Sequence, residues 1–252
     1  MSAIFDIGMF DGLDTAYYLE CGYQVVAVEA NPEMIARVSA QRAAELADGR
    51  LVIVHAAMAT SRDPVTLHLS GKDLGSSSTI PEKVEGKSPS GVVTVPGLPL
   101  ADLLSKYGMP RFMKVDIEGA DRVCVLALTA GSVPEHLSFE IGPDFQELLD
   151  HARAIGYRRF KIVNQMSYRE LANHENLQDR LARRFSRLLG RPKPTHVRRS
   201  GRLFACGYCS GPLPWRSDGT WRTYEQTVEG WKAAQGGLAN SGWYDLLATT
   251  TG

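Results

Sequence analysis

The chain has 252 residues, 44% of them hydrophobic, which suits one sizeable domain or a domain with a small appendage. Lys and Arg number 28, as do Asp and Glu, so no overall field favours nucleic acid or an anionic membrane as a partner. No apolar run approaches the roughly 20 residues of a membrane span, and the first residues do not form a secretory signal, so a cytoplasmic protein is expected.

Short β-rich runs alternate with helical patterns through the first two-thirds of the chain. Continuous Val and Ile runs indicate strands that are buried on both faces, hence a parallel sheet. Repeated strand–helix units predict a doubly wound, Rossmann-like α/β fold with a mostly parallel sheet. The predicted strands are residues 3–8, 24–30, 51–58, 111–119, 136–142 and 157–165. The predicted helices are residues 12–23, 32–49, 120–128 and 144–156.

The middle and the end of the chain have a different composition. Residues 64–70 alternate apolar and polar side chains like an edge strand, and a polar loop rich in Gly and Ser follows at 71–91. We therefore divide the chain into a Rossmann-like core at 1–165, an Arg-rich insert or lid at 166–202, and a C-terminal extension at 203–252. The extension holds a last strand and a Trp-containing tail that is expected to pack on the core.

The arginine-rich stretch has two interpretations. Its arginines are either a solvated helix face or a landing site for an acceptor that carries phosphate or carboxylate. Nucleic acid is not expected, because the Trp residues do not interleave with the basic run. Cys206 and Cys209 form a CxxC pair without a second pair at zinc spacing, so the sequence predicts no metal centre.

A carboxylate and two glycines mark the end of the first predicted strand. Gly8 permits a tight turn, and Gly12 opens a helix whose free N–H groups would lie beside a ligand. The dinucleotide pattern GxGxxG is absent, and Asp6 stands two residues before the first glycine. A carboxylate there is unfavourable beside a pyrophosphate but favourable beside the amino group of a methionine moiety. The motif therefore favours S-adenosylmethionine over NAD as the cofactor.

Two further acidic motifs end predicted strands. Glu29 follows Gly12 by 17 residues, a position from which its carboxylate can accept both hydroxyls of a ribose; the alternative is a solvated acid at a strand end. Lys114, Asp116 and Glu118 alternate, so we expect them on one face of the strand at 111–119. The alternative for these three is a Lys114–Asp116 ion pair with Glu118 in solvent.

The segments DIGMFDGLDT, VAVEANP, VPGLPLADLLSKYGMPRFMKVDIEGAD and HLSFEI together resemble FkbM-type methyltransferases. That family is a branch of the class I enzymes that depend on S-adenosylmethionine and have a Rossmann-like sheet. The resemblance covers about residues 4–165, and KVDIEGAD is its most specific signature. It implies methyl transfer, usually to a hydroxyl of a sugar, a lipid-linked glycan or a natural product.

The resemblance also implies roles for individual residues. The implied cofactor contacts are Asp6, Gly8 and Gly12 at the methionine end, Glu29 at the ribose, Ala30, Asn31 and Ala57 near the adenine, and Asp116 near the sulfonium and the acceptor. Two features depart from the family, because only two residues precede the first strand and Met9-Phe10 replaces the usual Ala-Asn. A roof for the site is then expected from loop 71–91, from the Arg-rich insert or from a second subunit.

Methyl transfer to a hydroxyl needs a base, since a sugar hydroxyl has a high pKa. The candidates are Glu118 and Asp116, with His55 as a weaker third, and Glu140 could orient the acceptor. The sequence thus predicts an O-methyltransferase that acts on a small-molecule or glycan acceptor, with an anionic acceptor and a homo-oligomer left open. The alternatives are an NAD(P)-dependent oxidoreductase and a noncatalytic small-molecule-binding module.

Overall fold

The computed structural model describes residues 2–71, 77–84, 89–171, 195–235 and 243–251. The chain divides into two compact units. We call Met1–Tyr157 the N-terminal unit and Arg158–Gly252 the C-terminal unit.

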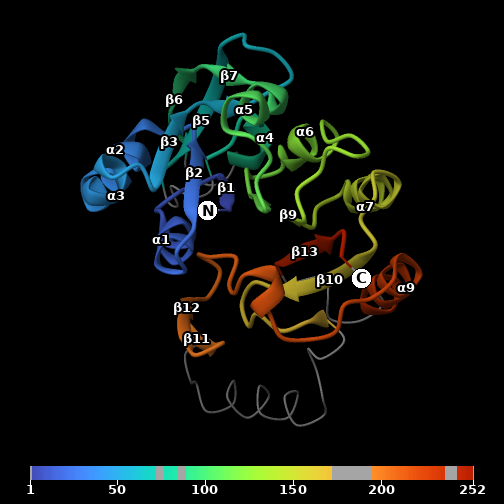
Figure 1. Cartoon of the computed structure of the whole chain (residues 1–252). Coiled ribbons are helices and arrows are strands. Elements are labelled where there is room, and N and C mark those ends of the chain that lie inside the picture. Colours follow the sequence, from blue (N-terminus) through green and yellow to red (C-terminus); the bar gives the residue numbers. More distant parts are fainter. Residues whose placement is uncertain (1, 72–76, 85–88, 172–194, 236–242, 252) are drawn as a thin grey trace, which may run out of the picture. The chain divides into compact units, whose positions relative to one another are not determined.

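The N-terminal unit contains parallel strands in the order β9-β8-β1-β2-β3 (Figure 1). Their bounds are β1 (Ala3–Ile7), β2 (Gln24–Glu29), β3 (Leu51–His55), β8 (Phe112–Val115) and β9 (His136–Glu140). The chain winds from β1 through β2 to β3 and then returns to β8 and β9 on the other side of β1. This reversal makes the fold doubly wound and Rossmann-like, as predicted, with a topological switch point between β1 and β8.

Helices connect these strands, and most of them follow the predicted pattern. They are α1 (Leu13–Glu20), α2 (Pro32–Gln41), α3 (Ala43–Ala47), α5 (Leu100–Tyr107), α6 (Asp121–Val125) and α7 (Phe145–Ala154). Asn31 caps α2 by accepting a hydrogen bond from the N–H of Glu33, and Pro32 suits the first turn. The predicted helix at 32–49 is two helices, because Arg42 leaves the helical conformation at φ −120° and ψ 31°.

Two short pairings lie beside the main sheet. β4 (Ala57–Met58) pairs with β7 (Gly97–Leu98), so the predicted strand at 51–58 is in fact two strands. β5 (Val65–Ser70) pairs antiparallel with β6 (Pro89–Val95), which confirms a strand at 64–70. The short helix α4 (Pro81–Val84) lies between β5 and β6 in the chain. Ala57, Leu67 and Val95 form a small apolar cluster here.

The predicted strand at 111–119 is too long. Strand β8 ends at Val115, although the N–H of Asp116 still donates to the carbonyl of Ile7 at 2.9 Å. The chain then turns, and Glu118 and Gly119 have φ values of 52° and 90°. Lys114, Asp116 and Glu118 therefore do not share one face of a strand, contrary to the prediction.

The C-terminal unit contains an antiparallel pair of strands, β10 (Arg159–Asn164) and β13 (Tyr244–Thr249). A hairpin of β11 (His196–Arg199) and β12 (Arg202–Ala205), the short turn η3 (Pro214–Arg216) and helix α9 (Tyr224–Gln235) complete it. β10 confirms the predicted strand at 157–165. Most of the arginine-rich stretch lies outside the described residues.

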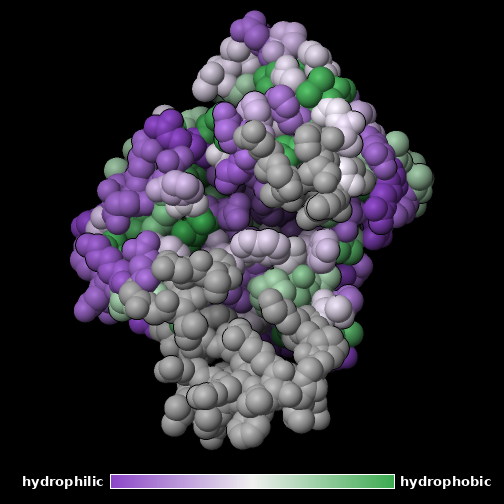
Figure 2. Space-filling model, turned by 180° about the vertical axis from the view of Figure 1, so that it is seen from behind, coloured by the Kyte–Doolittle hydropathy of each residue, from purple (hydrophilic) through white to green (hydrophobic). Residues whose placement is uncertain are grey.

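One face of the described residues is largely polar. On the face in Figure 2, polar side chains (purple) predominate and apolar ones (green) lie in small groups among them. Among the helices that the structure describes, none is long and apolar enough to cross a membrane.

Candidate functional site

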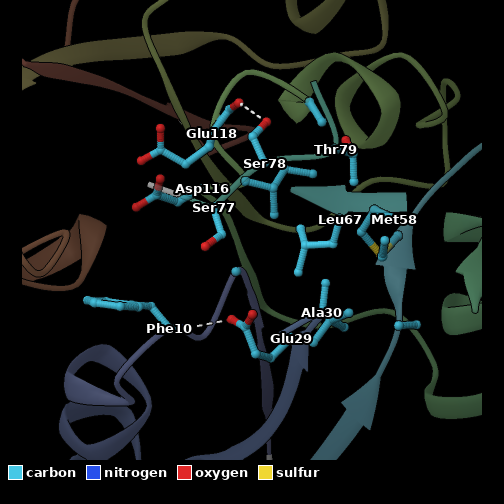
Figure 3. Close-up of a pocket in the computed structure, with 16 residues that line it drawn as sticks. Phe10, Glu29, Ala30, Met58, Leu67, Ser77, Ser78, Thr79, Asp116 and Glu118 are labelled. Atoms are coloured by element: carbon cyan, nitrogen blue, oxygen red, sulfur yellow. Dashed lines mark hydrogen bonds between the residues drawn. The ribbon is translucent and has the colours of Figure 1, made fainter. Parts of the chain in front are cut away.

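A cavity opens at the carboxyl ends of β1, β2 and β8, where ligands bind in open α/β sheets (Figure 3). Its volume is about 590 Å³ when the open mouth is included. The lining residues are Gly8, Phe10, Val28, Glu29, Ala30, Ala56, Ala57, Met58, Leu67, Ser77, Ser78, Thr79, Asp116, Ile117, Glu118 and Ala120.

Gly8 joins two loops at the floor of the cavity. Its φ is 85°, and its N–H donates to the carbonyl of Val28 at 2.9 Å. A Cβ at this position would lie 1.8 Å from the carbonyl oxygen of Asp116, so a side chain cannot be accommodated without displacing a loop. Gly12, by contrast, does not line the cavity; it stands at the start of α1, and a Cβ there would meet Val38 at 3.0 Å.

The carboxylate of Glu29 is fixed by backbone groups. Its Oε2 accepts a hydrogen bond from the N–H of Phe10 and its Oε1 one from the N–H of Asn31, each at 2.7 Å. Burial raises the pKa of Glu29, and these hydrogen bonds lower it in part. Both oxygens keep further acceptor capacity toward the cavity, because a carboxylate has about four lone-pair sites. The alternative of a solvated acid at a strand end is therefore wrong.

Asp6 lies beneath the cavity and does not line it, which differs from the role expected for it. Its carboxylate is fully buried, accepts a hydrogen bond from Thr15 Oγ1 at 2.6 Å, and lies 3.2 Å from Lys114 Nζ. Lys114 Nζ also lies 3.3 Å from Asp14 Oδ2 and donates to the carbonyl of Gly8 at 3.1 Å. Asp6 thus supports the glycine turn from below.

Lys114 is the centre of this buried network. Burial alone would lower its pKa, but the carboxylates of Asp6, Asp14 and Asp116 raise the pKa well above its usual value. The distance from Lys114 Nζ to Asp116 Oδ2 is 3.7 Å, longer than the distances to the two buried aspartates. The alternative of a simple Lys114–Asp116 pair with Glu118 in solvent is therefore wrong, because Glu118 lines the cavity.

Asp121, the first residue of α6, is a buried acid with no functional signal in the sequence pattern. It is 4% exposed, and its Oδ1 has no hydrogen-bond partner among the described residues. Burial raises its pKa to about 8, and the nearby charges of Asp116 and Glu140 act in the same direction. Glu140 does not line the cavity. Within the described residues, no group of three or more His, Cys, Asp or Glu side chains is arranged to hold a metal ion.

The residues expected near an adenine divide into two groups. Ala30 and Ala57 line an apolar part of the cavity together with Met58 and Leu67. Asn31 does not line it; this side chain is buried, and its Nδ2 atom has no hydrogen-bond partner among the described residues.

His55 does not line the cavity either. It is exposed at the end of β3, with its Nε2 3.2 Å from the carbonyl of Ala30. The structure therefore removes His55 from the candidate bases.

The described part of the Ser-rich segment forms one wall of the site. Ser77, Ser78 and Thr79 line the cavity, as the expectation of a roof from 71–91 requires. Phe10 also lines it and has an unusual φ of 50°. Leu67 and Met58 gave no signal in the sequence beyond their apolar character.

The sequence profile of the methyltransferase FkbM domain matches residues 6–159. Among curated proteins, none shows significant sequence similarity to this chain.

Solved structures give more distant matches. The FkbM methyltransferase of Methylobacillus flagellatus is 13% identical over 55% of this chain, with a TM-score of 0.37, and the match spans only 32% of that protein. Precorrin-6y C5,15-methyltransferase of Geobacter metallireducens is 9% identical over 99% of this chain and 80% of its own, with a TM-score of 0.41. Phosphoethanolamine N-methyltransferase 2 of Haemonchus contortus was solved with S-adenosyl-L-methionine. It is 12% identical over 100% of this chain and 49% of its own, with a TM-score of 0.36.

Proposed function

The chain belongs to the FkbM family of S-adenosylmethionine-dependent methyltransferases, and we propose that it methylates a hydroxyl of a sugar, glycan or natural product. The observation that carries the proposal is the charge of the cavity. Its lining contains the carboxylates of Glu29, Asp116 and Glu118 and, among the described residues, no Lys, Arg or His. Such a lining attracts a cation and repels a pyrophosphate.

The parts of the cavity fit the parts of the donor. We assign to Glu29 the acceptance of hydrogen bonds from the ribose hydroxyls, and to the apolar surface of Ala30, Ala57, Met58 and Leu67 the packing against the adenine ring. Gly8 supplies a close backbone approach, because only a residue without a Cβ fits against Asp116. The remaining acids, Asp116 and Glu118, are then left for the sulfonium and the acceptor.

When it is bound, S-adenosylmethionine supplies an activated methyl group on a positively charged sulfur. We assign to Glu118 the role of base, so that its carboxylate takes the proton of the acceptor hydroxyl as the new carbon–oxygen bond forms. Asp116 is the second candidate for this role, and its Oδ2 lies 3.7 Å from Lys114 Nζ. Both side chains line the cavity from the same loop, which brings them to one end of it.

The same charges bear on the acceptor. Three carboxylates disfavour an anionic group close to the transferred methyl, so we propose that the reacting end of the acceptor is uncharged. Any anionic group of the acceptor would then bind away from this cavity.

Donor binding is the first test. Calorimetry should detect micromolar binding of S-adenosylmethionine and of S-adenosylhomocysteine. Glu29→Ala should weaken both by about 10- to 100-fold, since it removes the hydrogen bonds to the ribose. Glu33→Ala, an exposed acid of the first turn of α2, is the matched control and should bind like the wild type. An absence of binding at millimolar donor would contradict the proposal.

Methyl transfer is the second test. A panel of alcohols, sugars and amines is incubated with methyl-labelled donor, and label should enter hydroxyl compounds. Glu118→Gln should lose transfer while S-adenosylhomocysteine still binds, because a neutral amide cannot take the proton. Donor binding without transfer to any compound would favour the noncatalytic binding module instead, and a thermal shift with NAD(P) alone would favour an oxidoreductase.

A further inference from the structure

The segment from Ser77 to Val84 contacts the loop that carries the proposed base. Ser78 is 1% exposed, and it forms a two-way backbone pair with His68 of β5, at 2.9 and 3.1 Å. Its hydroxyl accepts a hydrogen bond from the N–H of Ile80 at 3.1 Å and donates one to the backbone carbonyl of Glu118 at 3.0 Å (Figure 3). Because a backbone carbonyl can only accept, the hydroxyl proton of Ser78 is directed to Glu118.

Glu118 has a backbone conformation that needs such support. Its φ of 52° lies in the left-handed region, which is unfavourable for a residue with a Cβ and persists where the surroundings fix it. Gly119 follows with φ 90°, and a Cβ there would lie 2.6 Å from Cε of Lys83 in α4. The segment 77–84 therefore touches the turn at both residues.

The conformation of this peptide decides where the carboxylate of Glu118 lies. In Figure 3 the backbone carbonyl of Glu118 points to Ser78, while its carboxylate points the other way, in the same direction as that of Asp116. If the peptide relaxed to an ordinary conformation, the side chain would leave its present direction, because rotation of φ moves Cβ and the carbonyl together.

We propose that Ser78 is a positioning residue that acts through Glu118, holding its peptide so that the carboxylate faces the cavity. The proposal rests on the proposed function of this cavity as a donor site with Glu118 at its sulfonium end. In this proposal the Ser-rich segment not only lines the cavity but also positions the base. Ser78 itself need not touch the reacting atoms, because its proton is committed to the carbonyl of Glu118.

The charge of the donor provides a readout that does not require the acceptor. S-adenosylmethionine is positively charged at sulfur and S-adenosylhomocysteine is neutral, so a nearby carboxylate favours the first over the second. Glu118→Gln should lower the affinity for S-adenosylmethionine about fivefold to tenfold and leave that for S-adenosylhomocysteine within about twofold. Ser78→Ala should produce the same selective loss, about threefold to tenfold, because the carboxylate is no longer held in place.

A double-mutant cycle measured by calorimetry tests whether the two residues act as one. In the Glu118→Gln background, Ser78→Ala should have no further effect on S-adenosylmethionine binding beyond about twofold. The matched control is Ser90→Ala. Ser90 lies in β6 and also donates to a backbone carbonyl, that of Leu69, but it is exposed. This control should leave both affinities unchanged.

The outcomes separate the two proposals. Equal loss of both ligands in Ser78→Ala, or additive effects in the cycle, would show a merely structural role and overturn the inference. A wild-type protein that binds neither ligand would instead overturn the proposed function. Should Ser78→Ala fail to fold, Ser78→Cys, which keeps the branch shape but has a larger and weaker donor atom, replaces it. It should show a smaller selective loss, and an unchanged ratio of the two affinities would again overturn the inference.

Discussion

Each of the two units buries a lysine on a β-strand, and the two lysines have opposite electrostatic surroundings. Lys114 of β8 lies 3.2 and 3.3 Å from two buried carboxylates, which raise its pKa well above the usual value despite its burial. Lys161 of β10 donates instead to the carbonyl and the hydroxyl of Ser217, both at 3.0 Å, and lies 4.6 Å from the centre of the Trp221 ring. Burial lowers its pKa to about 8, although Glu170 and Asp218 act in the opposite direction.

The difference shows that burial alone does not decide the charge of a side chain. Desolvation disfavours the ammonium in both places, and only charges within ion-pair distance reverse the outcome. In the N-terminal unit these charges lie directly beneath the cavity, where Lys114 also contacts the carbonyl of Gly8. Lys114 is therefore paired with buried carboxylates next to the site, whereas Lys161 is held mainly by neutral acceptors and an aromatic face.

The largest expected effect comes from removing the charge at Lys114. Lys114→Met leaves the buried carboxylates of Asp6 and Asp14 without their ammonium, and we expect a loss of about 3–5 kcal/mol in the free energy of unfolding. Lys161→Met removes two hydrogen bonds to neutral groups, so its expected loss is about 1–2 kcal/mol. Urea denaturation of both variants measures the difference, and equal losses would contradict the comparison.

The second prediction concerns Asp121, whose pKa of about 8 lies above its unfolded value. The folded state therefore keeps a proton that the unfolded state loses, so this carboxyl makes the protein less stable as pH rises from about 4 to 8. Asp121→Asn has no proton to lose. It should raise the free energy of unfolding by about 1–3 kcal/mol near pH 7 and change it little near pH 4.

Urea denaturation at the two pH values is the measurement for this variant. Asp102→Asn is the control, because Asp102 is a surface acid paired with Arg62 and its pKa is lowered by that pairing. A stabilisation by Asp121→Asn that is the same at both pH values would show that the charge of Asp121 is not its cause.

Much of the fold could be predicted from the sequence, because local pattern determines it. Runs of Val and Ile are enough to place parallel strands, and the turn at Gly8 follows from a glycine after a strand. The alternation of Lys114, Asp116 and Glu118 continues the strand pattern beyond Val115, so the sequence does not mark the end of β8. The break at Arg42 has no Gly or Pro to mark it.

The candidate site was only partly predictable, for a related reason. The sequence pattern places Glu29 at the end of a strand, and in the structure it lines the cavity, with hydrogen bonds from the adjacent turn at Asn31 and from Phe10 of the preceding β1–α1 turn. The local sequence around Asp6 does not reveal its buried pairing, because its partner Lys114 stands 108 residues away in the chain. The contact of Ser78 with Glu118 spans 40 residues and has no signature beyond a run of serines. Long-range partners decide these roles, and a single sequence does not reveal them.

The smallest expected effect is a pH dependence carried by Lys161. Its pKa is about 8 in the folded state, against about 10.5 in the unfolded chain. Between these values the unfolded state binds more protons, so Lys161 makes the protein more stable as pH rises from about 8 to 10, by roughly 1–2 kcal/mol after solvent screening. Lys114 adds no slope there, because a raised pKa keeps it protonated in both states until pH exceeds about 10.5.

Unfolding free energies at about pH 7.5, 8.5 and 9.5 should therefore rise less steeply in Lys161→Met than in the wild type. Lys232→Met, a change at an exposed lysine of α9, should keep the wild-type slope, and an unchanged slope in Lys161→Met would mean that this lysine stays charged when buried.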